Sequence, residues 1–210
     1  SESTSGYPRR YHPPLPTNAW PTDSYADILH DVTALPATPP GLYEVQLILF
    51  DKLSLATVPL TDGERTLVLG TVQLERPEEP PTIAPQFESD GRWGDITLVG
   101  YNLDRQEAAP GDPFLLTTFW QADGAMDGDY NAILRLVDAD GNIALTKNFA
   151  PVRRDFPTSQ WQDGDLWRGQ QTFRLPVALE SGVYAWQICL TNDETCEVVG
   201  LNTLAITAPE

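Results

Sequence analysis

The sequence has few basic residues for its length. Lys and Arg number 13 against 30 Asp and Glu, which gives the 210 residues a formal net charge of −17. Nucleic acids and anionic membrane surfaces are both bound through clustered Lys and Arg. The composition therefore argues against both kinds of partner and indicates a solubilising acidic surface.

Long apolar runs are also absent from the sequence. No run approaches the ~20 residues that a helix needs to cross a bilayer, and Ser1–Gly6 has no signal-peptide pattern. No segment has the period of a long amphipathic helix, whereas 19 prolines and 15 glycines indicate frequent turns. Short alternating segments between such turns predict an all-β fold of the sandwich type.

Residues typical of catalytic sites are scarce. His12 and His30 are the only histidines, and Gly-x-Ser-x-Gly, His-Glu-x-x-His and phosphate-loop motifs are missing. The acidic stretches Asp123–Asp129 and Asp138–Asn142 have calcium-loop spacing but lack the distal Glu and flanking helices, so we interpret them as hairpin turns. The sequence predicts no catalytic residue, metal site or cofactor, and hence a chain that is not itself an enzyme.

Cysteine is nearly absent as well. Cys189 and Cys196 are the only two, and they flank a segment with the composition of a hairpin tip. A disulfide could join them if the two strands place them directly opposite each other, and it would suit an extracytoplasmic compartment. Two free thiols are the alternative.

An internal repeat organises the chain. An offset of 141 residues aligns 15–51 with 156–192 without a gap and gives eight identities in 37 positions. Such self-similarity indicates a tandem of like structural units. The identical pairs are Pro16/Pro157, Thr17/Thr158, Trp20/Trp161, Ala37/Ala178, Gly41/Gly182, Tyr43/Tyr184, Gln46/Gln187 and Leu49/Leu190.

A proline-rich stretch separates the two units. Residues 77–86 contain four prolines and predict a stiff linker, which leaves an N-terminal module at 1–76 and a second module at 87–210. In the N-terminal module we expect strands at Tyr25–Val32, Leu42–Asp51, Leu53–Pro59 and Thr66–Leu74. In the second we expect them at Ile96–Leu103, Phe114–Gln121, Tyr130–Asp138, Ile143–Asn148, Asp165–Leu175, Val183–Thr191, Thr195–Leu201 and Thr203–Thr207.

The N-terminal module is incomplete. It has no counterpart of the first strands of the second module, so the predicted fold is a tandem of immunoglobulin-like β-sandwich modules of which the first is partial. Its apolar face, with Tyr43, Val45, Leu47 and Leu49, needs a cover, because each buried side chain contributes roughly 1.5–3 kcal/mol. The module could fold back on the second one or pair with another copy. Since a stiff linker hinders folding back, the sequence favours a homodimer.

Four aromatic residues recur in the repeat. Trp20 and Trp161 occupy one repeat position, and Tyr43 and Tyr184 occupy another. Because ligand contacts need not recur in both units, we interpret all four as structural. Each Trp is expected to close an edge of its sandwich and to bond its indole N–H to a loop carbonyl.

Two other tryptophans are the candidates for a binding site. Trp93 lies among Gly, Arg and Asp residues, and Trp167 is followed by Arg168. These polar surroundings favour exposed aromatic side chains. Exposed indole faces can pack on pyranose rings, so Trp93 and Trp167 are the candidate ligand-binding residues.

The second module resembles a known family. The relevant motifs are Gly94–Leu103, Pro110–Asp112, Leu115–Ala122, Leu136–Gly141, Pro157–Trp161 and Ser181–Tyr184. They resemble the extracytoplasmic C-terminal β-sandwich modules of bacterial membrane glycosyltransferase-like proteins of the lipid-linked-sugar type. The resemblance covers 87–210 and, through the repeat, much of 15–74. It implies an extracytoplasmic, non-catalytic accessory module, because the family's chemistry lies in its membrane part.

Two functions follow from this resemblance. An accessory module of a glycosyltransferase-like membrane protein would contact glycans or cell-envelope partners. A structural or adhesion module would act through protein contacts without affinity for glycans. A glycoside-acting enzyme would instead need a cleft with two carboxylates ~5–10 Å apart.

The cysteine pair gives a first testable prediction. Intact, unreduced protein should be two daltons lighter than the reduced chain in mass spectrometry, because a Cys189–Cys196 disulfide removes two hydrogens. The bond should contribute about 2–3 kcal/mol, since it closes a short loop. Complete reaction of both thiols with a maleimide, without prior reduction, would refute the disulfide.

Overall fold

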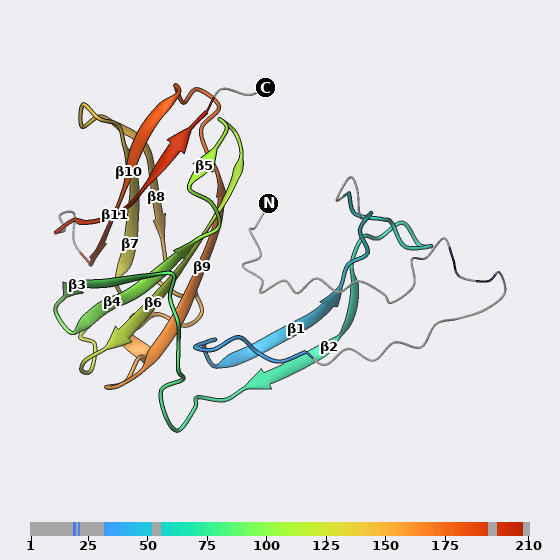
Figure 1. Ribbon diagram of the computed structural model, residues 1–210. Helices are drawn as coiled ribbons and strands as arrows, with labels where there is room; N and C mark the ends of the chain where they lie inside the picture. The colour runs from blue at the N-terminus through green and yellow to red at the C-terminus, as the bar shows by residue number, and fades with distance from the viewer. Residues whose placement is uncertain (1–18, 20, 22–31, 52–55, 193–196, 208–210) are drawn as a thin grey trace.

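The computed structural model describes residues 19, 21, 32–51, 56–192 and 197–207 (Figure 1). His12, Trp20, His30 and Cys196, and most of the strand expected at Tyr25–Val32, lie outside the described residues. The strands are β1 (Gly41–Leu47), β2 (Leu67–Leu74), β3 (Phe87–Trp93), β4 (Ile96–Leu103), β5 (Glu107–Ala108), β6 (Pro113–Ala122), β7 (Asn131–Val137), β8 (Ile143–Phe149), β9 (Leu166–Arg174), β10 (Gly182–Thr191) and β11 (Val199–Ile206), with a short 3-10 helix η2 (Thr158–Gln160) before β9.

Strands β3–β11 form a two-layer β-sandwich. One sheet has the order β3-β4-β6-β9, and the other has the order β5-β11-β10-β7-β8. All neighbours are antiparallel except β5 and β11, which run parallel. The two sheets face each other in Figure 1. The all-β, sandwich-type fold expected from the sequence is thus confirmed.

An aromatic core fills the space between the sheets. Trp120 of β6 and Trp186 of β10 come from opposite sheets, and both side chains are fully buried. The ring of Phe114 lies 4.9 Å from that of Trp186, and the ring of Trp93 lies 6.0 Å from that of Trp120, between centroids. Alternate residues of each strand supply this core because successive side chains point to opposite faces of a sheet.

Several strand expectations differ from the structure, and the two-residue strand β5 has no counterpart among the expected strands. No strand is expected at β3, because Glu88, Asp90 and Arg92 interrupt its apolar character. In the structure these three residues occupy the outer face of an edge strand. The strands expected at Thr195–Leu201 and Thr203–Thr207 are one strand, β11, with a register shift in its pairing with β10. Within the described part of Leu53–Pro59 there is only a bridge, formed by Thr57.

The hairpin β1–β2 repeats the hairpin β10–β11 at the level of hydrogen bonds. Gly41 pairs with Leu74 and Tyr43 with Val72; at the repeated positions Gly182 pairs with Ile206 and Tyr184 with Leu204. Both hairpins then have a register shift within three residues of the tyrosine. The internal repeat is therefore a repeat of structure as well as of sequence.

The two tyrosines also make the same bond. The Tyr43 hydroxyl donates to the Pro39 carbonyl at 2.8 Å, and the Tyr184 hydroxyl donates to the Glu180 carbonyl at 3.1 Å. Each bond reaches four residues back along the chain and ties the start of its strand to the preceding turn. This is the hydrogen bond by which a tyrosine corner fixes a strand entry in β-sandwiches.

Gly169 in β9 offers a test of how closely the sandwich is packed. A Cβ at this position would come within 2.0 Å of the Pro151 carbonyl oxygen and 2.7 Å of the Thr118 Oγ1. Gly169→Ala should therefore lower the free energy of unfolding by about 1–3 kcal/mol or more, measured by urea denaturation. Gly200→Ala in β11 is the control, because a Cβ there meets nothing within 4 Å. Equal stability of the two variants would contradict this packing.

Candidate functional site

The two tryptophans expected to bind a ligand are not exposed. Trp93 is 7% exposed, and its indole N–H donates to the Glu197 carbonyl at 2.7 Å. Trp167 is 1% exposed and meets the Phe156 ring edge-on, with centroids 5.3 Å apart. The expectation of exposed aromatic side chains is wrong because residues distant in the sequence cover both rings.

The remaining described tryptophans are buried as well. Trp161 lies on the core side of η2, and its indole N–H, expected to bond a loop carbonyl, donates to no group among the described residues. Trp120 and Trp186 belong to the core. Over the part of the chain that the structure describes, no indole face is available to stack on a sugar ring.

Cys189 is disulfide-bonded and buried in β10. Its expected partner, Cys196, lies outside the described residues. The pairing of the two therefore stays a prediction for mass spectrometry.

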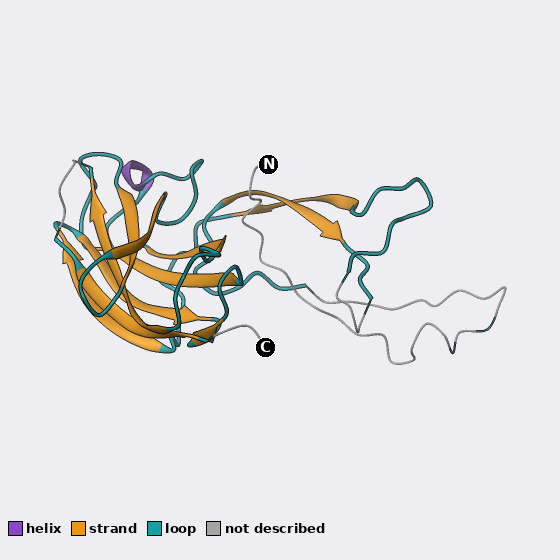
Figure 2. Ribbon diagram, turned by 90° about the horizontal axis from the view of Figure 1, so that it is seen from above, coloured by secondary structure: helices purple, strands orange, loops and turns teal. Residues whose placement is uncertain are grey.

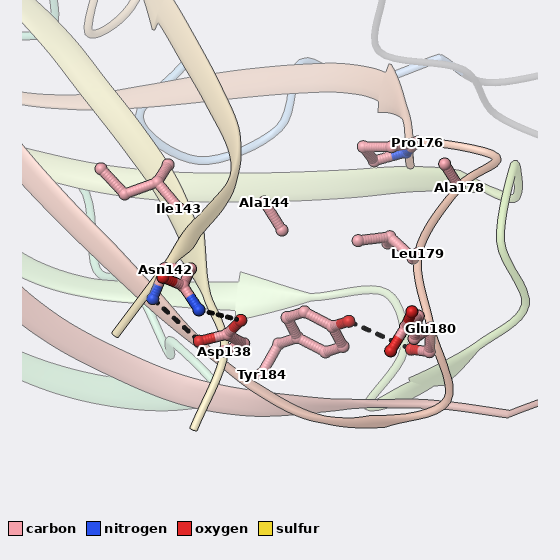
Figure 3. A pocket seen from close by; sticks show the side chains of 9 residues that line it. All are labelled: Asp138, Asn142, Ile143, Ala144, Pro176, Ala178, Leu179, Glu180 and Tyr184. Carbon is pink, nitrogen blue, oxygen red and sulfur yellow. Dashed lines mark hydrogen bonds between the residues drawn. The ribbon is translucent and has the colours of Figure 1, made fainter. Parts of the chain in front are cut away.

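A hollow of about 390 Å³ lies between the β7–β8 turn and the segment leading into β10 (Figure 3). The Asp138 carboxylate accepts hydrogen bonds from the backbone N–H groups of Asp140 and Asn142, and the side-chain hydrogen bond from Asn142 lowers the pKa of Asp138 below its usual value. Tyr184 points toward Glu180 and bonds its carbonyl. These polar groups complete a turn and a corner, as the hairpin-turn interpretation predicts for Asp138–Asn142.

The described residues contain neither a metal-binding cluster nor a membrane-spanning helix. They contain no group of three or more His, Cys, Asp or Glu side chains that could hold a metal ion. None of their helices is long and apolar enough to cross a membrane. Contacts also join the N-terminal module to the sandwich.

One such contact is made by Arg76, at the end of the N-terminal module. Its guanidinium pairs with the Asp165 carboxylate and donates to the Gln160 carbonyl at 2.9 Å. The same group lies 5.4 Å from the Trp167 ring centroid and 5.8 Å from that of Phe156, within the range of cation–π attraction. We call this set of contacts the Arg76 clasp, and it explains part of the burial of Trp167.

A second contact joins the start of β1 to the sandwich. The backbone N–H of Arg168, on the outer strand β9, donates to the Ala37 carbonyl at 2.7 Å. The Arg153 guanidinium lies 4.6 Å from the Tyr43 ring centroid and pairs with Asp155. Burial raises the pKa of the Tyr43 hydroxyl, and the hydrogen bond from Arg153 lowers the pKa of the Asp155 carboxyl. Tyr43 is thus half-buried in an intrachain contact.

The linker is docked rather than free. A Cβ at Gly100 of β4 would come within 2.5 Å of the Pro85 ring, and the Gln86 backbone N–H donates to the Asn102 side chain at 2.6 Å. The sequence predicts that a stiff linker hinders folding back. In the structure the linker instead packs on β4, and its stiffness does not keep the modules apart. Over its described residues, the N-terminal module contacts the second one through its turn, Tyr43, Arg76 and the linker.

These contacts leave the hairpin itself uncovered. We call β1, β2 and the described residues between them the β1–β2 arm; it extends sideways from the sandwich in both views (Figures 1 and 2). Glu44 is the only charged residue in the two strands. Clustered apolar exposure of this kind marks interaction sites. Exposed aliphatic side chains of the two strands are Leu42, Leu47, Leu67, Val68, Leu69 and Val72.

The β1–β2 arm is the candidate functional site, and the sequence predicts only part of it. The alternating apolar residues of β1 indicated a face that needs a cover. The repeat indicated that the covering strands were missing. What no local signal could give is that the fold-back contacts reach Tyr43 but leave Leu47, Leu49 and Val72 exposed.

The chain is distantly similar to several solved structures. No protein-family model and no curated protein matches the sequence. The structure is similar to that of the C-terminal domain of wzt, with a TM-score of 0.42 and 15% identity over 60% of this chain and 84% of that chain. It is also similar to Spo0M, a sporulation control protein from Bacillus subtilis, with a TM-score of 0.35 and 11% identity over 56% and 51% of the two chains. Neither likeness carries an argument about function.

The Arg76 clasp gives a prediction about the attachment of the arm. Arg76→Ala should lower the free energy of unfolding by about 1.5–3 kcal/mol, the usual contribution of hydrogen bonds to a charged group. The reason is that it leaves the largely buried Asp165 carboxylate without its cation. Amide hydrogen exchange should rise at residues 35–47 and 67–76. Arg92→Ala is the matched control, since Arg92 makes an exposed ion pair with Asp123 of little expected value. Unchanged exchange in Arg76→Ala would contradict the clasp.

Proposed function

We propose that this chain is a non-catalytic accessory module that works through protein contacts, with the β1–β2 arm as its contact surface. The observation that carries the proposal is the exposure of aliphatic side chains on the arm, in a chain that otherwise buries its core between two sheets. The partner is a cell-envelope protein, and the setting is the extracytoplasmic side of a membrane glycosyltransferase-like protein. The resemblance of the second module to such accessory modules supports this setting.

We also assign the second module to the immunoglobulin-like sandwiches. The short strand β5 runs parallel to β11 at the edge of one sheet. The tyrosine near the start of β10 bonds the backbone four residues upstream, as at the tyrosine corner of such domains. Modules of this class commonly serve as rigid spacers and contact surfaces, which is consistent with an accessory role.

Binding of glycans by this chain has less support than binding of proteins. The aromatic candidates for it, Trp93 and Trp167, are buried, and the hollow beside Tyr184 is lined by groups that already satisfy one another. A module without glycan affinity, acting by structural or adhesive contacts, therefore fits the geometry better. A glycan array is expected to give no signal with this chain.

Two kinds of protein could occupy the arm. One is a second copy of this chain, which would make the homodimer that the sequence favours. The other is a different polypeptide. Both satisfy the requirement that apolar side chains on an open hairpin be covered.

Site-specific photo-crosslinking in the source cells tests the proposal. A photo-reactive amino acid at Leu47 in β1 should form a covalent product with a second protein chain. The control carries the same amino acid at Val177, which is exposed but lies outside the arm. Products from Val177 alone, or from neither position, would overturn a contact function for the arm, and a glycan-array signal would restore the sugar-binding hypothesis.

A further inference from the structure

The molecule contains its own example of how such a hairpin is normally covered. The β10–β11 hairpin has the register of the β1–β2 arm, with Tyr184 opposite Leu204 where the arm has Tyr43 opposite Val72. On the inward face of β10–β11, Ile188, Leu190 and Leu204 are 0–2% exposed. The repeated positions on the arm, Leu47, Leu49 and Val72, are 41–47% exposed. The same face is thus buried in one copy and open in the other.

The cover over β10–β11 has three parts. Strand β7 pairs antiparallel with the free side of β10, and β5 pairs parallel with the free side of β11. The sheet β3-β4-β6-β9 lies across the inward face (Figure 1). Apart from β9, all of these strands belong to residues 87–149, which form the front half of the sandwich. Over the described residues, the two-stranded arm has no third strand beside it.

We propose that the β1–β2 arm completes a second β-sandwich by docking on a half-sandwich of the β3–β8 type from outside residues 1–210. The partner has a strand of the β7 type with an unpaired edge, which adds beside β1. It also has an apolar sheet, which covers Leu47, Leu49 and Val72. This inference rests on the proposed protein-contact function and names the chemistry of the partner.

A second copy of the chain fits this requirement poorly. Its front half, β3–β8, is already closed by its own β9–β11. It could offer only a second two-stranded arm, which is a smaller sheet than the four strands that cover the inward face of β10–β11. A strand added to a sheet edge gains main-chain hydrogen bonds, and the alternate side chains select the partner. A separate half-sandwich supplies a strand edge beside β1 and a full sheet over the inward face, whereas a second copy supplies no full sheet.

The repeat also fixes the expected register. In the second module Trp186 lies opposite Leu136, and Leu190 lies opposite Ala132. The same pairing on the arm places Val45 and Leu49 opposite those two positions of a β7-type strand. Residues directly opposite share a face, so the partner strand would bring its buried aliphatic residues onto the inward face of the arm.

The probe for the test is a synthetic peptide with the β7–β8 sequence, residues 129–149, added to the 210-residue chain. Backbone amide NMR should show concentration-dependent shifts confined to 41–49 and 67–74. A Leu136→Asp peptide should bind at least about tenfold more weakly, because it places a charge on the buried face. Two chain variants make the matched pair: Leu47→Asp on the inward face should weaken binding at least about tenfold, and Leu42→Asp should not change it.

Leu42 is a suitable control because its repeat position is open in the complete module. Leu42 is 62% exposed and Val183, its equivalent, is 60% exposed. Equal weakening by Leu42→Asp and Leu47→Asp, or absence of peptide binding to the arm, would overturn the inference. So would a dimer mass in light scattering that Leu47→Asp converts to monomer, because a second copy would then be the occupant. That last result would leave the protein-contact function intact, whereas absent crosslinks from Leu47 would remove the function itself.

Discussion

An amphipathic β-hairpin is stable only when a second sheet covers its apolar face and other strands pair with its edges. This chain contains the same hairpin twice and satisfies that constraint once. Around β10–β11, the strands β5 and β7 and the opposite sheet close a complete sandwich. Around β1–β2 the described residues provide neither the neighbouring strands nor the facing sheet. The difference between a finished domain and an open arm lies in what surrounds the hairpin, because the two hairpins have the same pairing.

The open arm is held in place by contacts at its base. Arg76 uses an ion pair, a carbonyl and two aromatic faces of the second module, and Arg153 lies over the Tyr43 ring. Arginine suits both positions because its planar guanidinium can bond in its plane and stack on its faces. The Arg153 contact covers the Tyr43 ring at the start of the apolar face, and neither contact covers Leu47, Leu49 or Val72. The base is therefore fixed to the sandwich while the surface that could bind a partner remains accessible.

The candidate residues show which structural properties a local sequence pattern predicts poorly. Trp93 and Trp167 stand among polar neighbours in the sequence, which favours exposure, but Glu197 and Arg76 reach them from 104 and 91 positions away. Exposure is a property of the whole fold, so neighbours along the chain predict it poorly. Tyr43 and Tyr184 are different, because each bonds a carbonyl only four residues back. A role that depends on such a local bond can be recognised from a repeated motif.

The sequence by itself determined the all-β class and the equivalence of the two hairpins, and it predicts that the N-terminal module is partial. These follow from periodicity, turn residues and self-similarity, which act over short distances along the chain. Only the tertiary structure decided that the linker docks on β4, that the tryptophans are internal, and that Leu47, Leu49 and Val72 stay open. These outcomes depend on which distant surfaces meet. The free energy of burial is set by the area that both surfaces lose to water, and no local pattern contains the second surface.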